Sequence, residues 1–124
     1  MATVIRGSDG FDSADNASQT ELDNLTNAKN QCTAWVNFDG ATATIIDSYN
    51  VSSVVRVSVG NYDIYFTTSM NNLNWSVSGS STASARMTSE RGIARTVDKS
   101  SMDCFSYAGA AEDRVISLMY FGGK

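Results

Sequence analysis

Short apolar segments separated by turn residues govern what this chain can fold into. From Cys32 onward, Val, Ile, Tyr and Phe gather in segments that recur about every eight to twelve residues. In 62–67 apolar side chains alternate with more polar ones, as in a strand with one buried face. The sequence contains no Pro, so Gly, Asn and Asp must form the turns. This pattern predicts an all-β fold over 32–124, an antiparallel, jelly-roll-like β-sandwich.

The same pattern places the individual strands. We expect them at 32–38, 42–50, 51–59, 62–67, 75–79, 93–97, 104–108 and 115–121. Asp39-Gly40 and Gly60-Asn61 are turn signals between neighbouring strands. The segment 78–90 is rich in small polar residues and is predicted to be a long loop.

The polar segment 1–31 differs in composition from the rest of the chain. Ser18-Gln-Thr-Glu21 has the spacing of a capping box, in which Ser18 and Glu21 each bond the other's backbone amide. The two Leu residues that follow would share one face of a short helix, but an extended, flexible arm fits the same residues. The opening MATVIRGSDG lacks the apolar core of a secretory signal. We therefore expect an N-terminal arm, 1–31, and a β-sandwich domain, 32–124.

The residue types that the chain lacks exclude several kinds of catalytic and metal-binding site. It contains no His, which removes His-based catalytic triads and His metal ligands. Two Cys cannot form a four-Cys zinc site within one chain. Nine basic residues against thirteen acidic ones leave a net charge of −4, which does not favour nucleic-acid binding. No apolar run reaches the length of a transmembrane helix. We expect no bound cofactor, no nucleic acid and no membrane insertion.

The carboxylates lie mostly at predicted turns, where Asp is a common capping residue. Asp9, Asp12 and Asp15 recur at every third position, which is not the spacing of a calcium-binding hand. A solvated acidic segment is favoured there over a calcium site. A glycosidase-type carboxylate pair stays open as a minor alternative, because such pairs meet only in space. The sequence thus predicts a protein without catalytic or metal-binding residues.

Cys32 and Cys104 are far apart in the sequence, and each lies at the start of a predicted strand. They could pair if those strands were neighbours. Two buried free thiols are favoured, since the sequence shows no export signal.

Two of the predicted strands are apolar on both faces. The strand 51–59 has Val54 on one face and three further Val residues on the other, and 115–121 is similar. In a sandwich of 13.3 kDa, a strand normally keeps one face in water. Two such strands therefore imply a second burial surface, which a symmetric homo-oligomer supplies most simply.

Large side chains at alternating strand positions are assigned to packing. The residues expected in core and subunit packing are Trp35, Phe38, Tyr62, Phe66, Trp75, Val115 and Leu118. Trp35, Tyr65, Trp75 and Tyr107 could instead face outward, where aromatic rings stack on sugar rings or enter a subunit contact. The sequence does not separate these two roles.

The chain contains the strings AWVNFDG at 34–40, SYNVSS at 48–53 and NYDIYFTTSM at 61–70, which resemble a small β domain of bacteriophage tail-fibre and related virion proteins. AWVNFDG at 34–40 is similar to the family's opening AWVNFNG. SYNVSS at 48–53 and NYDIYFTTSM at 61–70 follow in the same order, where SFNVSSI and GDYTVNFTTAM are typical of the family. The start IRGSDGFDS at 5–13 also resembles the IRGSDNFDS of short phage structural proteins. After Met70 the chain departs from the family, because it reads NNLNW where a Pro-Asp pair and a Tyr are usual.

The resemblance implies a non-enzymatic virion protein, assembled in the host cytoplasm and then carried outside the cell on the particle. Its partners would be two further copies of itself, other virion proteins and a glycan or protein of the host surface. The arm would provide the attachment element, with Ile5, Arg6 and Phe11 as its candidate residues. Candidate receptor-facing loop residues are Asn71, Asn72, Asn74, Ser81, Arg86 and Glu90.

Three alternatives to a trimeric fibre or tip module stay open. A capsid decoration protein would use the same trimeric fold, and its N-terminal arm would bind the capsid shell. A free carbohydrate-binding module would be a monomer that stacks a sugar on an exposed aromatic ring. A small enzyme is least favoured, because the chain has no His and its Asp residues lie at turns.

Overall fold

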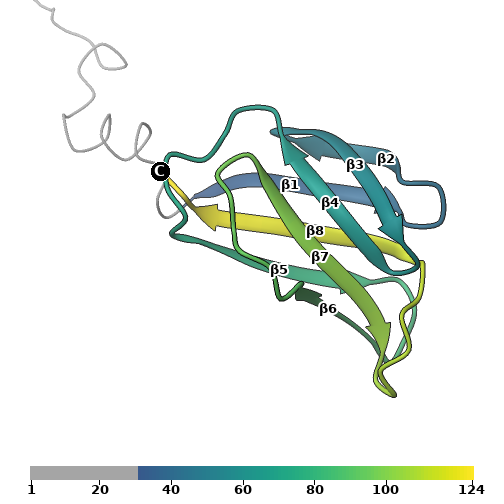
Figure 1. Cartoon of the computed structure of the whole chain (residues 1–124). Helices are drawn as coiled ribbons and strands as arrows, with labels where there is room; N and C mark the ends of the chain where they lie inside the picture. Colours follow the sequence, from purple (N-terminus) through teal and green to yellow (C-terminus); the bar gives the residue numbers. More distant parts are fainter. Residues whose placement is uncertain (1–30) are drawn as a thin grey trace, which may run out of the picture.

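Eight antiparallel strands build residues 31–124, the part of the chain that the computed structural model describes (Figure 1). They are β1 (Cys32–Asp39), β2 (Thr44–Tyr49), β3 (Val51–Ser58), β4 (Asn61–Phe66), β5 (Trp75–Ser81), β6 (Arg86–Glu90), β7 (Lys99–Ser106) and β8 (Val115–Gly122). Sheet I has the strand order β2-β1-β8-β5, and sheet II has the order β3-β4-β7-β6. The predicted all-β antiparallel sandwich is confirmed.

The chain alternates between hairpins and crossings from one sheet to the other. β1 and β2 form a hairpin in sheet I, and β3 and β4 form one in sheet II. β2 and β3, the adjoining edge strands of the two sheets, are joined through Asn50 (Figure 1). The chain then crosses to β5, returns to sheet II for β6 and β7, and ends in sheet I with β8.

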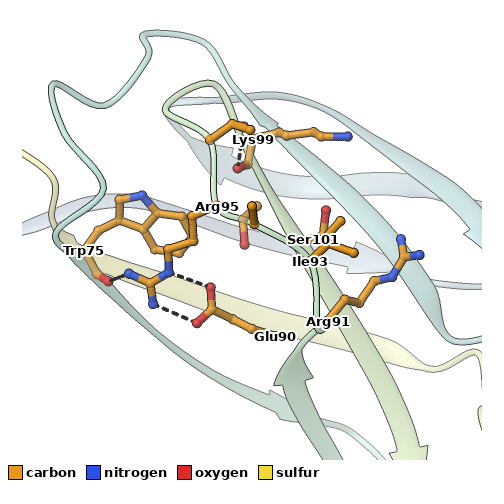
Figure 2. A pocket seen from close by; sticks show the side chains of 10 residues that line it. Trp75, Glu90, Arg91, Ile93, Arg95, Lys99 and Ser101 are labelled. Carbon is orange, nitrogen blue, oxygen red and sulfur yellow. Dashed lines mark hydrogen bonds and ion pairs between the residues drawn. The ribbon is translucent and has the colours of Figure 1, made fainter.

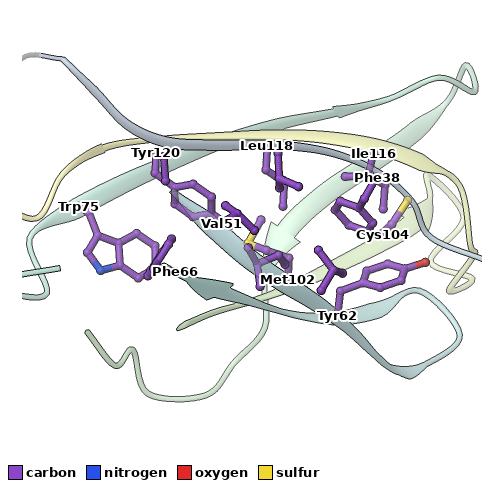
Figure 3. Close-up of a cluster of buried hydrophobic side chains, with 14 of the residues drawn as sticks. Phe38, Val51, Tyr62, Phe66, Trp75, Met102, Cys104, Ile116, Leu118 and Tyr120 are labelled. Atoms are coloured by element: carbon purple, nitrogen blue, oxygen red, sulfur yellow. The ribbon is translucent and has the colours of Figure 1, made fainter. Parts of the chain in front are cut away.

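The core lies between the two sheets because their strands alternate apolar and polar residues. In β4 and β8 every second side chain is buried. Aromatic rings dominate the interior (Figure 3): Phe38 packs edge-to-face on Tyr62, with 5.1 Å between ring centroids. Phe66 packs in the same way on Tyr120, at 5.2 Å. Each sheet therefore buries one face, and its other face is left to solvent or to a partner.

The prediction of a long loop over 78–90 is wrong, because two strands occupy most of it. Ser78 and Ser80 of β5 pair with Met119 and Ser117 of β8. β6 adds to the free edge of β7. The first part of β5 agrees with the strand predicted at 75–79, but its last inward positions are Gly79 and Ser81, so the apolar alternation that signals a strand is missing there.

The predicted weak strand at 93–97 is also absent, since this segment is part of the irregular connection between β6 and β7. The strand predicted at 104–108 begins earlier, at Lys99. Ser100 faces inward and is buried, and a Ser at an inward position hides the period-two pattern.

Two turns require residues that adopt a left-handed backbone. Gly60 has φ 70°, and a Cβ at this position would overlap the carbonyl oxygen of Cys104. Asn50 has φ 56°, and its side chain ties neighbouring segments together. Its Oδ1 accepts from the Thr68 amide at 2.7 Å, and its Nδ2 donates to the Thr33 carbonyl at 3.2 Å. These contacts fix the crossing between the two sheets.

Predictions for the N-terminal segment fall outside the described residues. They include the capping box at Ser18, the acidic series from Asp9 to Asp15, and the attachment residues Ile5, Arg6 and Phe11.

Candidate functional site

Exposed aliphatic side chains gather on the two edge strands that adjoin each other. We call Ile46, Val55, Val57 and Val59 the β2–β3 edge surface. Their exposed fractions are 58%, 46%, 50% and 49%. Ile46 bulges from β2, where the pairing with β1 shifts its register, and the three Val residues lie on β3 and in its following turn. Exposed edge strands with aliphatic side chains favour association with another chain.

A second surface lies on the outer face of sheet I. We call it the Trp35 groove; it has a volume of about 450 Å³, and its side chains come from Trp35, Asn37, Ser78, Ser80, Ser117 and Met119. Trp35 is opposite Met119, which is opposite Ser78, so these three form one row across β1, β8 and β5. Asn37, Ser117 and Ser80 form the next row. The groove therefore sets a mostly apolar row, which ends in Ser78, beside a row of hydrogen-bonding groups.

The residues assigned to packing divide between the core and the surface. Phe38, Tyr62, Phe66, Trp75 and Leu118 are buried in the core. Trp35 is 36% exposed on the outer face of sheet I, and Val115 is half-buried.

The aromatic residues considered for outward positions divide as well. Trp75 is buried, so the outward alternative is wrong for it, whereas Tyr107 is 77% exposed in the turn after β7. Tyr65 is half-buried on the outer side of sheet II, with the Lys99 ammonium 5.6 Å from its ring centroid.

The three predicted receptor-facing Asn residues lie in the loop between β4 and β5, as expected. Hydrogen bonds tie this loop to the C-terminal end of the chain. The Asn71 amide donates to the Gly123 carbonyl at 2.7 Å, and the Gly123 amide donates to the Asn74 carbonyl at 2.9 Å. Asn72 Oδ1 accepts from the Asn74 amide at 2.8 Å. These residues shape the loop, with Asn71 and Asn74 exposed at its surface.

The other three predicted loop residues lie in strands, which corrects the prediction. Ser81 ends β5, and Arg86 and Glu90 are the two ends of β6. Arg86 pairs with Glu112 at 2.7 Å. Ser81 and Arg86 lie at the opposite end of the sandwich from the Asn71–Asn74 loop, so the six residues form no common surface.

Arg95 anchors the connection between β6 and β7 (Figure 2). Its guanidinium makes two hydrogen bonds to the Glu90 carboxylate, at 2.9 and 2.7 Å, and lies 4.0 Å from the centroid of the Trp75 ring. It also donates to the Leu73 carbonyl at 3.0 Å and to the Trp75 carbonyl. The pKa of Arg95 is raised by the hydrogen bond with Glu90. The cluster is a structural anchor, since its charges are paired.

Asp113 holds the opposite end of the sandwich together. Its Oδ2 accepts from Arg56 Nη2 at 2.8 Å and from Nε at 3.1 Å. Its Oδ1 accepts from the Tyr62 hydroxyl at 2.6 Å and from the Gly60 amide at 2.9 Å. The Arg56 hydrogen bond, with those from Gly60 and Tyr62, outweighs burial and lowers the pKa of Asp113 to about 2. The carboxylate is therefore a structural acceptor, poorly suited to proton transfer near neutral pH.

Asp63 forms a second ionic group, on the outer face of sheet II. Burial alone would raise its pKa, but hydrogen bonds from Ser101 at 2.6 Å and Lys99 at 3.0 Å bring it below its ordinary value. Arg91 lies between Asp63 and Asp103, at 3.6 and 3.5 Å from their carboxylates. This face is thus covered by paired charges.

Both cysteines are free thiols, as the sequence favoured. Cys32 is only half-buried on β1 of sheet I, so the expectation of burial is wrong for it. Cys104 is buried on β7 of sheet II, and burial raises the pKa of its thiol, which makes it a poor nucleophile.

Comparisons with protein-family models, with curated proteins and with solved structures find no match to this chain. Within residues 31–124, no three Cys, Asp or Glu side chains come together as a metal site. The same part of the chain has no helix with the length and hydrophobicity to cross a bilayer. The two apolar surfaces are thus the strongest functional candidates in the described domain.

Proposed function

We propose that this chain is a non-enzymatic bacteriophage virion structural protein that acts as a homotrimeric fibre or tip module and contacts the host surface. The β2–β3 edge surface carries the proposal, because four aliphatic side chains stand about half exposed on adjoining edge strands. The sequence resemblance to phage tail-fibre domains supports the two other parts of the proposal, that the protein belongs to the virion and that three copies associate. In this view residues 1–31 attach the module to other virion proteins.

Self-association fits the chemistry of the β2–β3 edge surface. Closed rotational symmetry would bury the same four side chains in every copy and cover the free edges of β2 and β3. On the outer face of sheet II the charges next to β3 are paired, because Asp63 contacts both Lys99 and Arg91. Around a three-fold axis, this face of three copies can converge without burying unpaired charge.

A capsid decoration protein is the second candidate. It would use the same trimeric contact, and the polar Asn71–Asn74 loop would lie at the particle surface in either setting. The two functions differ in copy number, with hundreds of chains per particle expected for decoration and a few tens or fewer for a fibre.

A charge placed in the proposed contact is expected to separate the subunits. Val57→Asp should shift the solution mass of the full-length protein, measured by light scattering, from three chains to one at the same concentration. The physical reason is that each Asp would lose its hydration against aliphatic side chains of the next copy. Ser69→Asp adds the same charge in the exposed loop between β4 and β5 and should remain trimeric. A wild-type monomer, or a trimer that Val57→Asp leaves intact, would contradict the proposed contact.

A further inference from the structure

We infer that the Trp35 groove binds a neutral sugar ring, so that the host-surface partner of this module is an uncharged glycan. The inference rests on the proposed function for its biological setting, while the binding site itself is argued from the groove. The groove lies on β1, β8 and β5, and none of the four side chains of the β2–β3 edge surface lines it.

The dimensions of the groove suit one or two pyranose rings. Its two rows cross three neighbouring strands, which spans about 10 Å across the sheet. The rows are two residues apart along each strand, or about 7 Å. The volume of about 450 Å³ lies in the range of pockets that hold small molecules.

The apolar row offers a stacking surface. The Trp35 ring is 36% exposed and the neighbouring Met119 side chain is 48% exposed. An indole presents a flat, electron-rich face, which is the complement of the C–H face of a sugar ring. The backbone of Trp35 pairs with Tyr49 of β2 on one side and with Met119 of β8 on the other, so its place in the sheet is fixed before a ligand arrives.

The second row supplies hydrogen bonds for sugar hydroxyls. Ser117 Oγ donates to Asn37 Oδ1 at 3.3 Å, which orients the amide and leaves its NH2 group without a partner among residues 31–124. Ser80 completes this row across β8, and Ser78 adds a hydroxyl at the β5 end of the neighbouring row; both hydroxyls donate and accept. Sugar hydroxyls are likewise donors and acceptors, so this row can match them.

The polar and uncharged lining of the groove disfavours anionic ligands and a second copy. None of the side chains that line it is charged, so it offers no counter-ion for a phosphate, sulfate or carboxylate. A nucleotide would therefore stack on Trp35 with its phosphate unpaired. A second copy would bury the three Ser hydroxyls and the Asn37 amide against its own surface, which costs free energy unless each finds a partner. Burial of the β2–β3 edge surface has no such cost, because its four side chains are aliphatic.

Binding of neutral saccharides to the full-length protein tests the inference. The probes are maltotriose, cellotriose, chitotriose and lactose, with sialyllactose and a sulfated disaccharide as charged probes, each titrated by calorimetry. We expect at least one neutral saccharide to bind, and no charged probe to bind more tightly. Trp35→Ala should weaken that binding at least tenfold, and Asn37→Ala should weaken it severalfold. Tyr107→Ala removes a more exposed aromatic ring outside the groove and should leave the affinity unchanged.

The outcomes also separate this inference from the proposed trimer. Binding lost in Trp35→Ala, with the solution mass unchanged, supports the sugar site whatever the number of subunits. The absence of binding to every neutral saccharide overturns the inference, and so does binding that survives Trp35→Ala. Dissociation of the Trp35→Ala trimer would overturn it as well, because the groove would then be a subunit contact.

Discussion

Replacing Trp75 with Ala is expected to lower the free energy of unfolding by about 3–5 kcal/mol. Trp75 is 3% exposed, and its ring lies edge-to-face on Phe66 and Tyr120, at 6.1 and 5.6 Å between centroids. The substitution would open a cavity between the two sheets and remove the ring on which Arg95 lies. Urea unfolding followed by circular dichroism measures the loss, at one fixed protein concentration because subunit association adds to stability.

Trp35→Ala is the matched control for this prediction. The same truncation on the outer face of sheet I should cost no more than about 1 kcal/mol, because Trp35 is 36% exposed and packs on the sheet from one side. Equal losses for the two variants would contradict the assignment of Trp75 to the core and Trp35 to the surface. A small loss in Trp35→Ala also makes this variant a sound probe of sugar binding.

Replacing Asp113 with Ala is expected to cost about 2–3 kcal/mol of unfolding free energy. The substitution leaves the Tyr62 hydroxyl and the Gly60 amide without their acceptor, and Arg56 without its ion pair. Chemical unfolding at pH 7 measures the loss. Asp47→Ala serves as the control, because Asp47 is exposed on β2 and its carboxylate accepts only from the neighbouring Ser48 amide within residues 31–124. A loss no greater than that of the control would refute the structural role of Asp113.

The low pKa of Asp113 predicts how its contribution depends on pH. Its pKa is about 2 in the folded protein, against an ordinary value of 3.8. Since the unfolded chain takes up this proton at the higher pH, the contribution is complete above about pH 4 and is lost as the pH falls towards 2. The difference in stability between the wild-type protein and Asp113→Asn should therefore narrow over this interval and stay constant from pH 5 to 7. A difference that widened on acidification would contradict the assignment.

The fold could be predicted where strands have one apolar face. β4 and β8 alternate strictly, β1 does so from Ala34 onward, and the predicted positions of all three strands agree to within one or two residues. The end of β5 and all of β6 were not predicted, because Gly79 and Ser81 hold inward positions of β5 and the apolar side chain of β6, Met87, points outward. Pairing with β8 and β7 forms these two strands, and such long-range pairing leaves no period in the local sequence.

The candidate surfaces could be predicted only in part. Alternation along β1 places Trp35 and Asn37 on one face, and the double-faced Val segment of β3 indicated a second burial surface. The Ser residues of the Trp35 groove come from β5 and β8, and only the register of these strands brings them beside β1. Arg86 was taken for a loop residue for the same reason, since its partner Glu112 lies far along the chain.

The composition of purified phage particles tests the proposed function most directly. Quantitative mass spectrometry of particles produced from the genome that encodes this chain measures its copy number against the other structural proteins. The proposal predicts that the chain is present in a multiple of three, with a few tens of copies or fewer for a fibre or tip and hundreds for a decoration protein. Its absence from particles of infected cells that produce the protein would contradict a virion structural role.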